Sequence, residues 1–250
     1  MNKLQIFEMT RPEIEAALAD GVDTVVATFG STEQHGLHLP MGTDSLWGEA
    51  LGLRITDALG NALQAPGLRI GCSEHHMDFA GSLTLSLETF IAVVSDTCHS
   101  LARHGIKNIA LVPTHGGNFR PIAQAAEQIQ AKLPDTNLIA CSDLNGFMDT
   151  LWAVAKKYGF SPEHSGAHAG ENETSLILAL RPDLVHMDKA EAGFLGDHLA
   201  IVDAILRDGF KGVTTNGVLG DPAGARADIG EAYLDAMTDF FVEHIRVSKV

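Results

Sequence analysis

Short apolar runs alternate with longer amphipathic segments along most of the chain. The runs are rich in β-branched residues and end at glycine, proline or a polar turn, a pattern typical of buried parallel strands. They predict strands over residues 24–30, 67–72, 108–113 and 137–141. Between them, apolar side chains recur every three or four residues, which predicts helices. The helices are expected over residues 44–59, 88–104, 121–133, 146–158, 172–180 and 223–245.

This alternation predicts an α/β fold, in which a single domain has three layers, α/β/α, around a mostly parallel, doubly wound sheet. A chain of 250 residues with 45% hydrophobic residues is long enough to bury one large core. No fixed-period repeat and no proline- or serine-rich linker interrupts it, so residues 1–250 are expected to form one unit. The glycine-rich stretch 187–220 has weak periodicity, and both a long loop and an oligomer contact remain open for it.

Charge and composition narrow the possible partners. The chain has 32 acidic and 17 basic residues and a net charge of -15, so its electrostatic field should repel nucleic acids. The N-terminal stretch lacks the features of a secretory signal, and no apolar run approaches the ~18 residues of a membrane span. We therefore expect a cytoplasmic protein with no membrane partner. Three cysteines without a Cys-x-x-Cys spacing argue against a disulfide framework and a thiolate zinc site.

Three polar clusters follow predicted strands or begin predicted helices, where open α/β sheets bind their ligands. The first is STEQHGLHLPMGTD, with Glu33, His35, His38 and Asp44 in one loop. In extended backbone, Glu33 and His35 point to the same side, because side chains alternate along a strand. A carboxylate beside an imidazole suits Zn²⁺, Mn²⁺ or Fe²⁺. By itself, this stretch is equally compatible with a hydrogen-bonded structural loop.

The second and third clusters carry further histidines and acids. PTHGGN places His115 before two glycines, which let backbone approach a ligand closely. HAGENETS begins at His168, just before a predicted helix, and has Glu171 and Glu173 in the first turn of that helix. A lone histidine after a strand is more often structural, and acids at the start of a helix can simply cap it. The metal interpretation therefore depends on the three clusters together.

The three clusters, in this order and over about 140 residues, resemble the signatures of the creatininase (creatinine amidohydrolase) family. The resemblance implies two divalent metal ions, with zinc, manganese and iron all open. It also implies a homo-oligomer, specifically a hexamer. His168 is the implied acid–base group beside the substrate, and Glu171 is counted with it as catalytic. The implied metal ligands are Glu33, His35, a bridging Asp44, His115 and Glu171.

Substrate contacts also follow from the resemblance. Ser73 and His76 match a family element of the form Ser-x-x-His, although Ala80 and Ser82 depart from the residues that follow it in other members. These departures concern the substrate contacts and leave the implied metal ligands unchanged.

Two glycines and a tryptophan bear on which substrate is bound. Creatinine-cleaving members carry Tyr and Glu where this chain has Gly116 and Gly117, so creatinine is not expected to be turned over well. Trp152 lies where family members place a lid over the substrate. An amphipathic helix also buries a tryptophan for packing alone, so both roles remain open.

These inferences predict a hydrolase that acts on a small molecule. In this hypothesis a metal-bound hydroxide cleaves a C–N bond of a small cyclic amide or formamide, and His168 protonates the leaving nitrogen. Alternatives within the family are ring opening of a cyclic ketone such as an inosose and cleavage of a peptide precursor. An isomerisation or retro-aldol reaction at the same metals would take up no solvent oxygen. A non-catalytic metal-binding domain is disfavoured, because closed structural sites prefer cysteine.

Overall fold

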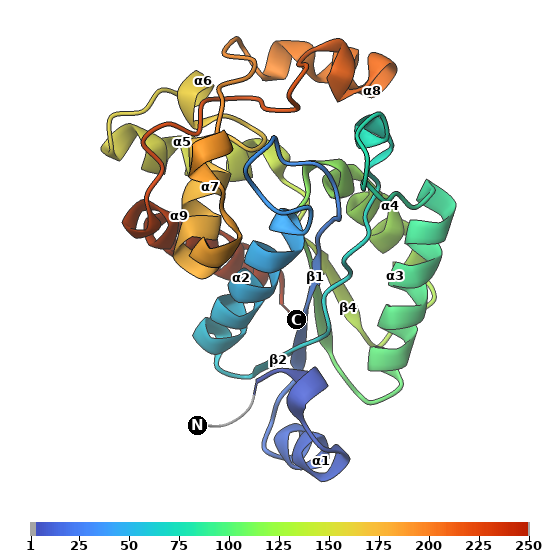
Figure 1. The fold of residues 1–250 in the computed structure, drawn as a ribbon. Coiled ribbons are helices and arrows are strands. Elements are labelled where there is room, and N and C mark those ends of the chain that lie inside the picture. Colours follow the sequence, from blue (N-terminus) through green and yellow to red (C-terminus); the bar gives the residue numbers. More distant parts are fainter. Residues whose placement is uncertain (1–3, 250) are drawn as a thin grey trace.

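The computed structural model describes residues 4–249, apart from the side chains of Leu199 and Leu206. Within this range, the named strands form a parallel sheet in the order β2-β1-β3-β4 (Figure 1). β1 and β3 pair along their whole length and are buried throughout, as expected for parallel strands that helices cover on both faces. The strands are β1 (Thr24–Phe29), β2 (Ala62–Gln64), β3 (Asn108–Pro113) and β4 (Asn137–Ala140).

Helices cover both faces of this sheet, with β1 sending Val26 to one side and Val25 and Ala27 to the other. The core around Val26 is shared by α2 (Thr43–Leu59), α5 (Leu144–Lys157), α7 (Glu171–Leu180) and α9 (Ala227–Ser248). The opposite core is shared by α1 (Arg11–Ala19), α3 (Leu87–Ala102) and α4 (Phe119–Gln130). Figure 1 accordingly shows α2, α7 and α9 on one side of the sheet and α3 and α4 on the other. The predicted three-layer α/β/α fold is confirmed.

One predicted strand is wrong. The strand expected over residues 67–72 is replaced by β2, which ends at Gln64, and Leu68 forms only an isolated bridge to Phe29. Pro66 has no N–H to give to a ladder. Gly67 lies so close to β1 that an added Cβ would be 2.8 Å from Thr28 Oγ1. The apolar run therefore leaves the sheet and continues toward the carboxyl ends of the strands.

The other predicted elements match observed ones with shifts at their ends. For example, α3 begins at Leu87, where the side chain of Ser86 accepts the Thr89 N–H at 3.2 Å. The later part of the chain folds over the carboxyl ends of the strands, at the top of Figure 1. It contains α6 (Pro162–Ser165), α8 (Val202–Asp208) and single turns such as η7 (Phe210–Gly212). The stretch 187–220 is thus a long excursion with a small core of its own around Ile205, Phe210 and Leu219.

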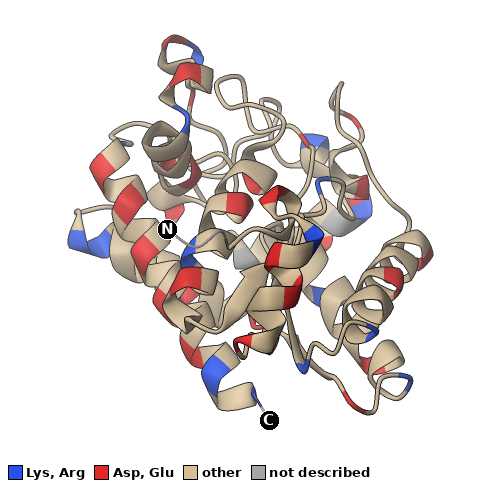
Figure 2. Cartoon of the chain, turned by 90° about the horizontal axis from the view of Figure 1, so that it is seen from below, with Lys and Arg blue, Asp and Glu red and all other residues tan. Residues whose placement is uncertain are grey.

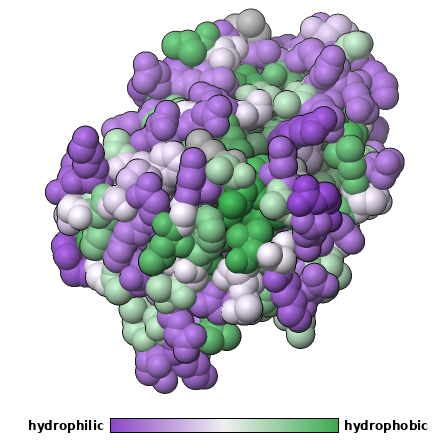
Figure 3. Space-filling view, turned by 90° about the horizontal axis from the view of Figure 1, so that it is seen from above, coloured by the Kyte–Doolittle hydropathy of each residue, from purple (hydrophilic) through white to green (hydrophobic). Residues whose placement is uncertain are grey.

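The chain carries more acidic than basic residues. Asp and Glu are spread over several outer helices in Figure 2. Seen from above, apolar side chains gather in a central band that hydrophilic side chains border (Figure 3). Among residues 4–249, no helix combines the length and the apolar character that crossing a bilayer requires.

Candidate metal centre

The three polar clusters meet at the carboxyl ends of β1 and β3. β1 leads into the loop that carries Glu33 and His35, and Asp44 follows in the first turn of α2. Thr114, directly after β3, donates a hydrogen bond from Oγ1 to the backbone oxygen of Asp44 at 2.9 Å. This bond ties the end of β3 to the start of α2 and brings His115, the next residue, beside Asp44.

Asp44 lies between two histidines. Its Oδ1 is 3.2 Å from His35 Nε2, and its Oδ2 is 3.3 Å from His115 Nδ1. Glu33 Oε1 is 3.2 Å from the same nitrogen of His115. All four residues are buried. The structure therefore brings four of the five ligands implied by the sequence into one enclosed space.

Backbone carbonyls orient the two imidazoles. His35 Nδ1 lies 3.1 Å from the carbonyl oxygen of Glu33, and His115 Nε2 lies 3.2 Å from that of Cys72. A carbonyl oxygen can only accept a hydrogen bond, so each of these ring nitrogens carries a proton. The opposite nitrogen of each ring then faces the carboxylates. Histidines that bind metals are held by hydrogen bonds of this kind.

Gln34 orders two further histidines, and sequence reasoning missed it although it lies between two implied ligands. His168 Nε2 donates to the backbone oxygen of Gln34 at 2.6 Å, which leaves His168 Nδ1 facing Glu33 Oε1 at 3.8 Å. The Gln34 amide donates to Gly217 O at 3.0 Å and to His76 Nδ1 at 3.1 Å. His76 therefore carries its proton on Nε2, which is 3.1 Å from Glu33 Oε1.

The pKa is raised for His35 and His115 and lowered for His168. Burial opposes a charge on His115, but the carboxylates of Glu33 and Asp44 outweigh it and raise the pKa of His115 to about 10. The pKa of His35 is raised in the same way, mainly by Asp44 against the effect of burial. For His168, burial and the neighbouring charge on His35 lower the pKa. In the metal-free protein, His35 and His115 are thus protonated near neutral pH, whereas His168 is neutral.

The pKa values of the two central acids, Glu33 and Asp44, are shifted in the opposite direction, downward. Burial disfavours the charge on Glu33, but His115 and His76 outweigh it and lower the pKa of Glu33. The pKa of Asp44 is lowered as well, against burial, chiefly by the charge on His35. Both acids are therefore ionised near neutral pH although their side chains are buried.

Two carboxylate oxygens at the centre are not satisfied by hydrogen bonds. Among the described residues, neither Glu33 Oε1 nor Asp44 Oδ2 has a donor in hydrogen-bonding geometry, although both are buried. Buried charged oxygens without donors are unfavourable unless a nearby cation compensates them, which is protonated His115 in the metal-free protein and would be a metal ion once His115 is deprotonated. Three overlapping groups in the described part of the chain could hold a metal ion: Glu33, His35 and Asp44; Glu33, His76 and His168; His35, His168 and Glu173. This nitrogen and oxygen donor set fits divalent metal ions.

The structure does not bring the implied ligand Glu171 to the cluster, and Glu173 lies there instead. Glu173 Oε2 is 3.6 Å from His35 Nε2 and accepts the Ala169 N–H at 2.6 Å. Glu171 is fully buried away from the cluster, where its carboxylate accepts hydrogen bonds from Tyr233 at 2.6 Å and Ser175 at 2.7 Å. Residues two apart on a helix face different directions, so only one of these acids can reach the cluster.

The predicted substrate residues Ser73 and His76 both lie close to Glu33. Ser73 Oγ is 2.6 Å from Ser31 Oγ, which in turn donates to Glu33 Oε2 at 3.0 Å. Ser73 is fully buried, so it supports Glu33 and offers no open surface for a substrate. His76 Nε2 lies 3.1 Å from Glu33 Oε1, and His76 belongs to one of the groups that could hold a metal ion. The Ser-x-x-His spacing thus marks a serine that supports Glu33 and a histidine of the cluster itself.

The two glycines after His115 have different environments. At Gly117, an added Cβ would lie 2.5 Å from Cys72 O, so only glycine lets His115 reach its carbonyl partner. At Gly116, an added Cβ would meet no heavy atom within 4 Å. Trp152 is half-buried and donates to Gly166 O at 3.4 Å. It packs against the core shared by α5 and α9 and is not among the described residues that line the pocket beside the cluster.

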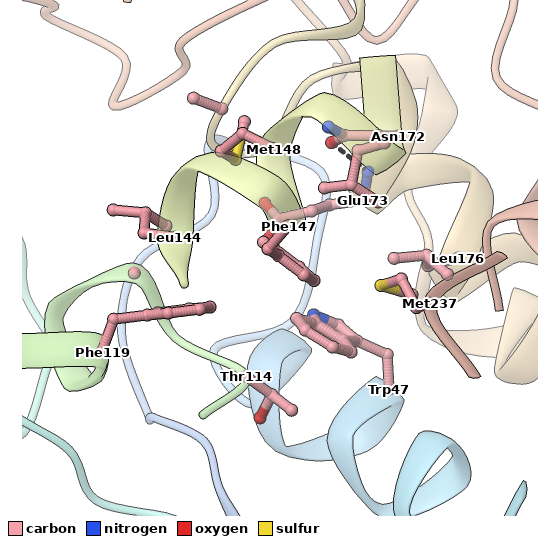
Figure 4. Close-up of a pocket in the computed structure, with 13 residues that line it drawn as sticks. Trp47, Thr114, Phe119, Leu144, Phe147, Met148, Asn172, Glu173, Leu176 and Met237 are labelled. Atoms are coloured by element: carbon pink, nitrogen blue, oxygen red, sulfur yellow. Dashed lines mark hydrogen bonds between the residues drawn. The ribbon is translucent and has the colours of Figure 1, made fainter. Parts of the chain in front are cut away.

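That pocket is mostly apolar and is shown in Figure 4. It touches the cluster through Glu173 and through residues next to His115 and His168. Phe210, which does not line this pocket, stacks on His76 with ring centroids 4.0 Å apart. Phe210 comes from the weakly patterned stretch 187–220, and no local signal in the sequence marks it. The pocket lining is Trp47, Thr114, Gly116, Phe119, Leu144, Phe147, Met148, Leu151, Ala167, Asn172, Glu173, Leu176 and Met237.

Comparison with known proteins gives one consistent result. The profile of the family described as "Creatininase: Creatinine amidohydrolase" matches residues 7–245. The chain is 30% identical over 230 residues to a mycofactocin precursor peptide peptidase of Mycobacterium ulcerans (strain Agy99), covering 89% of this chain and 84% of that protein. It is 31% identical over 199 residues to a creatinine amidohydrolase of Pseudomonas putida, covering 73% and 74%. A solved mutant creatininase of Zn-Zn type superposes with a TM-score of 0.80 at 27% identity, covering 99% of this chain and 98% of that one.

Proposed function

The chain belongs to the creatininase family, and on this premise we propose that it is a two-metal amidohydrolase that cleaves an amide C–N bond in a small substrate. The observation that carries the proposal is the position of Asp44. Its two oxygens face His35 and His115, and one of them has no hydrogen-bond donor among the described residues. A carboxylate with one oxygen toward each of two imidazoles is suited to bridge two ions.

The proposed ligands form two sets that share Asp44. Glu33 and His115 would hold one ion with it, and His35 and Glu173 would hold the other. Carboxylates and imidazoles without thiolates suit catalytic divalent metals such as zinc, manganese or iron. Metals bound there would lower the pKa of a coordinated water and polarise a substrate carbonyl.

His168 is placed to move a proton. It is neutral near neutral pH, and Gln34 fixes its proton on Nε2, so Nδ1 is free to accept another. His168 Nδ1 would take a proton from the attacking water while a C–O bond forms at the carbonyl carbon. It would then pass that proton to the nitrogen as the C–N bond breaks. The products are a carboxylate and an amine.

The amide can be cyclic, a formamide or a peptide bond. The similarity to the Mycobacterium ulcerans peptidase favours the peptide bond as a second candidate. The apolar pocket beside Glu173 favours any substrate with an apolar group. The homo-oligomer implied by the family resemblance remains part of the proposal.

The experiment is a substrate panel on metal-loaded protein in ¹⁸O-labelled water. We expect one class among lactams, formamides, short peptides and inososes to be hydrolysed, with one labelled oxygen in the product. Asp44→Asn should abolish turnover and reduce bound metal. His104→Ala, an exposed histidine remote from the cluster in the fold, is the matched control. Turnover without labelled oxygen, or full activity in Asp44→Asn, would contradict the proposal.

A further inference from the structure

The pocket beside the metal centre is formed where helices of one layer converge. Trp47 comes from α2, Phe147 and Met148 from α5, Leu176 from α7 and Met237 from α9. Figure 4 shows these side chains pointing toward one another around the pocket. Most of the residues that line it are apolar, and Thr114, Asn172 and Glu173 are the polar ones. An apolar group gains free energy by leaving water for such a place.

The pocket and the metal centre share a wall. Glu173 lines the pocket and also lies 3.6 Å from His35 Nε2. Thr114 and Gly116, the two chain neighbours of His115, line it as well. Since a Cβ at Gly116 would meet no heavy atom within 4 Å, there is room beside the backbone of that residue. A substrate whose carbonyl is at the cluster can therefore extend past Gly116 into the pocket.

The Trp47 indole in this wall has no hydrogen-bond acceptor in the part of the chain that the structure describes. Trp47 is 3% exposed, and its Nε1–H has no acceptor among the described residues. Its ring stacks on Phe147 with centroids 6.2 Å apart and an interplanar angle of 11°. In Figure 4 the indole nitrogen is turned toward the interior of the pocket. A buried N–H without an acceptor is unfavourable, so an acceptor on a bound molecule would stabilise this arrangement.

We infer that this pocket is a specificity subsite that selects substrates with an apolar group next to the scissile amide, and that the Trp47 N–H donates to one acceptor on that group. The inference rests on the proposed function, because it assumes that the reacting carbonyl is held at the metal centre. It narrows the substrate class to amides with a small apolar substituent. A compact, wholly polar ring would leave the subsite unused.

The test uses hydroxamates, which chelate divalent metals and can carry alkyl tails of chosen length. The chain has two tryptophans, so Trp152→Phe leaves Trp47 as the one indole, and its fluorescence reports on the pocket. Acetohydroxamate, butanohydroxamate and hexanohydroxamate are titrated into the zinc-loaded protein. We expect affinity to rise about tenfold or more for each two methylenes, since each buried methylene contributes about fourfold. The Trp47 fluorescence should respond to the longer tails.

Gly116→Leu places a side chain in the space beside the Gly116 backbone, between the cluster and the pocket. It should bring the affinity ratio of hexanohydroxamate to acetohydroxamate close to one. Met148→Gln, which makes the wall polar, should lower the same ratio and serves if Gly116→Leu loses metal or melts early. His104→Ala should keep the ratio. If longer tails do not raise the affinity, or if the rise in affinity persists in both pocket variants, the proposal of a subsite is contradicted. Failure of acetohydroxamate itself to bind would instead contradict the metal site on which the proposed function rests.

The hydrogen-bond donor is tested separately by calorimetry with keto analogues of hexanohydroxamate, with the ketone at the fourth or fifth carbon. For at least one analogue, we expect its affinity relative to hexanohydroxamate to fall about three- to tenfold in Trp47→Phe, the usual contribution of one hydrogen bond. If Trp47→Phe leaves the affinity of both analogues relative to hexanohydroxamate unchanged, Trp47 is not the donor.

Discussion

Glu171 and Glu173, two residues apart in the first turn of α7, send their carboxylates to different places. Glu173 lies 3.6 Å from His35 at the metal centre, whereas Glu171 accepts hydrogen bonds from Tyr233 and Ser175 in the core. One acid is therefore available for a metal, and the other fixes α7 against α9. The distinction leads to separate expectations for the two positions.

Glu173→Gln should weaken metal binding with little effect on the fold. The substitution keeps the shape of the side chain but removes an anionic ligand beside His35. We expect bound metal after dialysis to fall toward one ion per chain, with activity partly restored by excess metal. Glu171→Gln is the matched control, and elemental analysis should find its metal content unchanged. Metal loss in Glu171→Gln alone would restore the sequence-based assignment.

Glu171 should make stability depend on pH in a defined direction. Burial raises its pKa, while Tyr233 and Ser175 lower it less. A carboxyl whose folded pKa lies above its unfolded value of about 4.3 favours the fold most when protonated. That stabilisation is full below the unfolded pKa and is lost as the pH rises through the folded pKa. Relative to the wild type, metal-free Glu171→Gln should therefore gain thermal stability as the pH rises from about 4 toward neutrality. Melting curves at several pH values measure this, and parallel curves for the two proteins would contradict it.

Metal binding should release protons. His35 and His115 have raised pKa values in the metal-free protein, with His115 at about 10, and both must lose a proton to become ligands. We expect about two protons per chain at neutral pH, and tighter metal binding as the pH rises. Calorimetry in buffers of different ionisation enthalpy gives the number. His115→Ala should reduce it by about one, and His104→Ala should not change it. Zero proton release would show that neither histidine is a ligand.

His168→Ala should lose kcat while keeping metal. Because its Nδ1 is neutral and faces Glu33 at 3.8 Å, His168 is placed to carry a proton. With the substrate found in the panel, kcat should fall by about 10² to 10⁴, and excess metal should not restore it. Metal analysis of the same variant checks the assignment, since loss of an ion would identify His168 as a ligand.

Creatinine should be a poor substrate. Gly116 and Gly117 supply neither an aromatic wall nor an acid beside the centre, and the adjoining pocket is apolar. We expect a kcat/KM for creatinine well below about 10⁴ M⁻¹s⁻¹ on zinc- or manganese-loaded protein. A value at or above that level would show that other residues replace the missing contacts.

The layers of the fold and most of the cluster could be predicted from patterns along the chain. Strand and helix patterns depend on contiguous residues, so β1, β3 and β4 could be predicted, while Pro66 and Gly67 removed the strand that the apolar run alone indicated. Glu33, His35, Asp44 and His115 could be grouped because each lies in the loop after a strand or at the start of a helix, and parallel strands end at one edge.

The remaining features depend on contacts between elements that are far apart in the chain. Ala169 adopts a left-handed conformation with φ 52°, and the turn it makes before α7 sets which glutamate meets His35. No periodicity encodes that choice, because both acids fall in the same helical turn. Phe210 reaches His76 from a stretch without any regular pattern, and Trp47 lines its pocket with side chains from distant helices. Such contacts join residues far apart in the chain, so they depend on how the layers pack and on nothing that neighbouring residues specify.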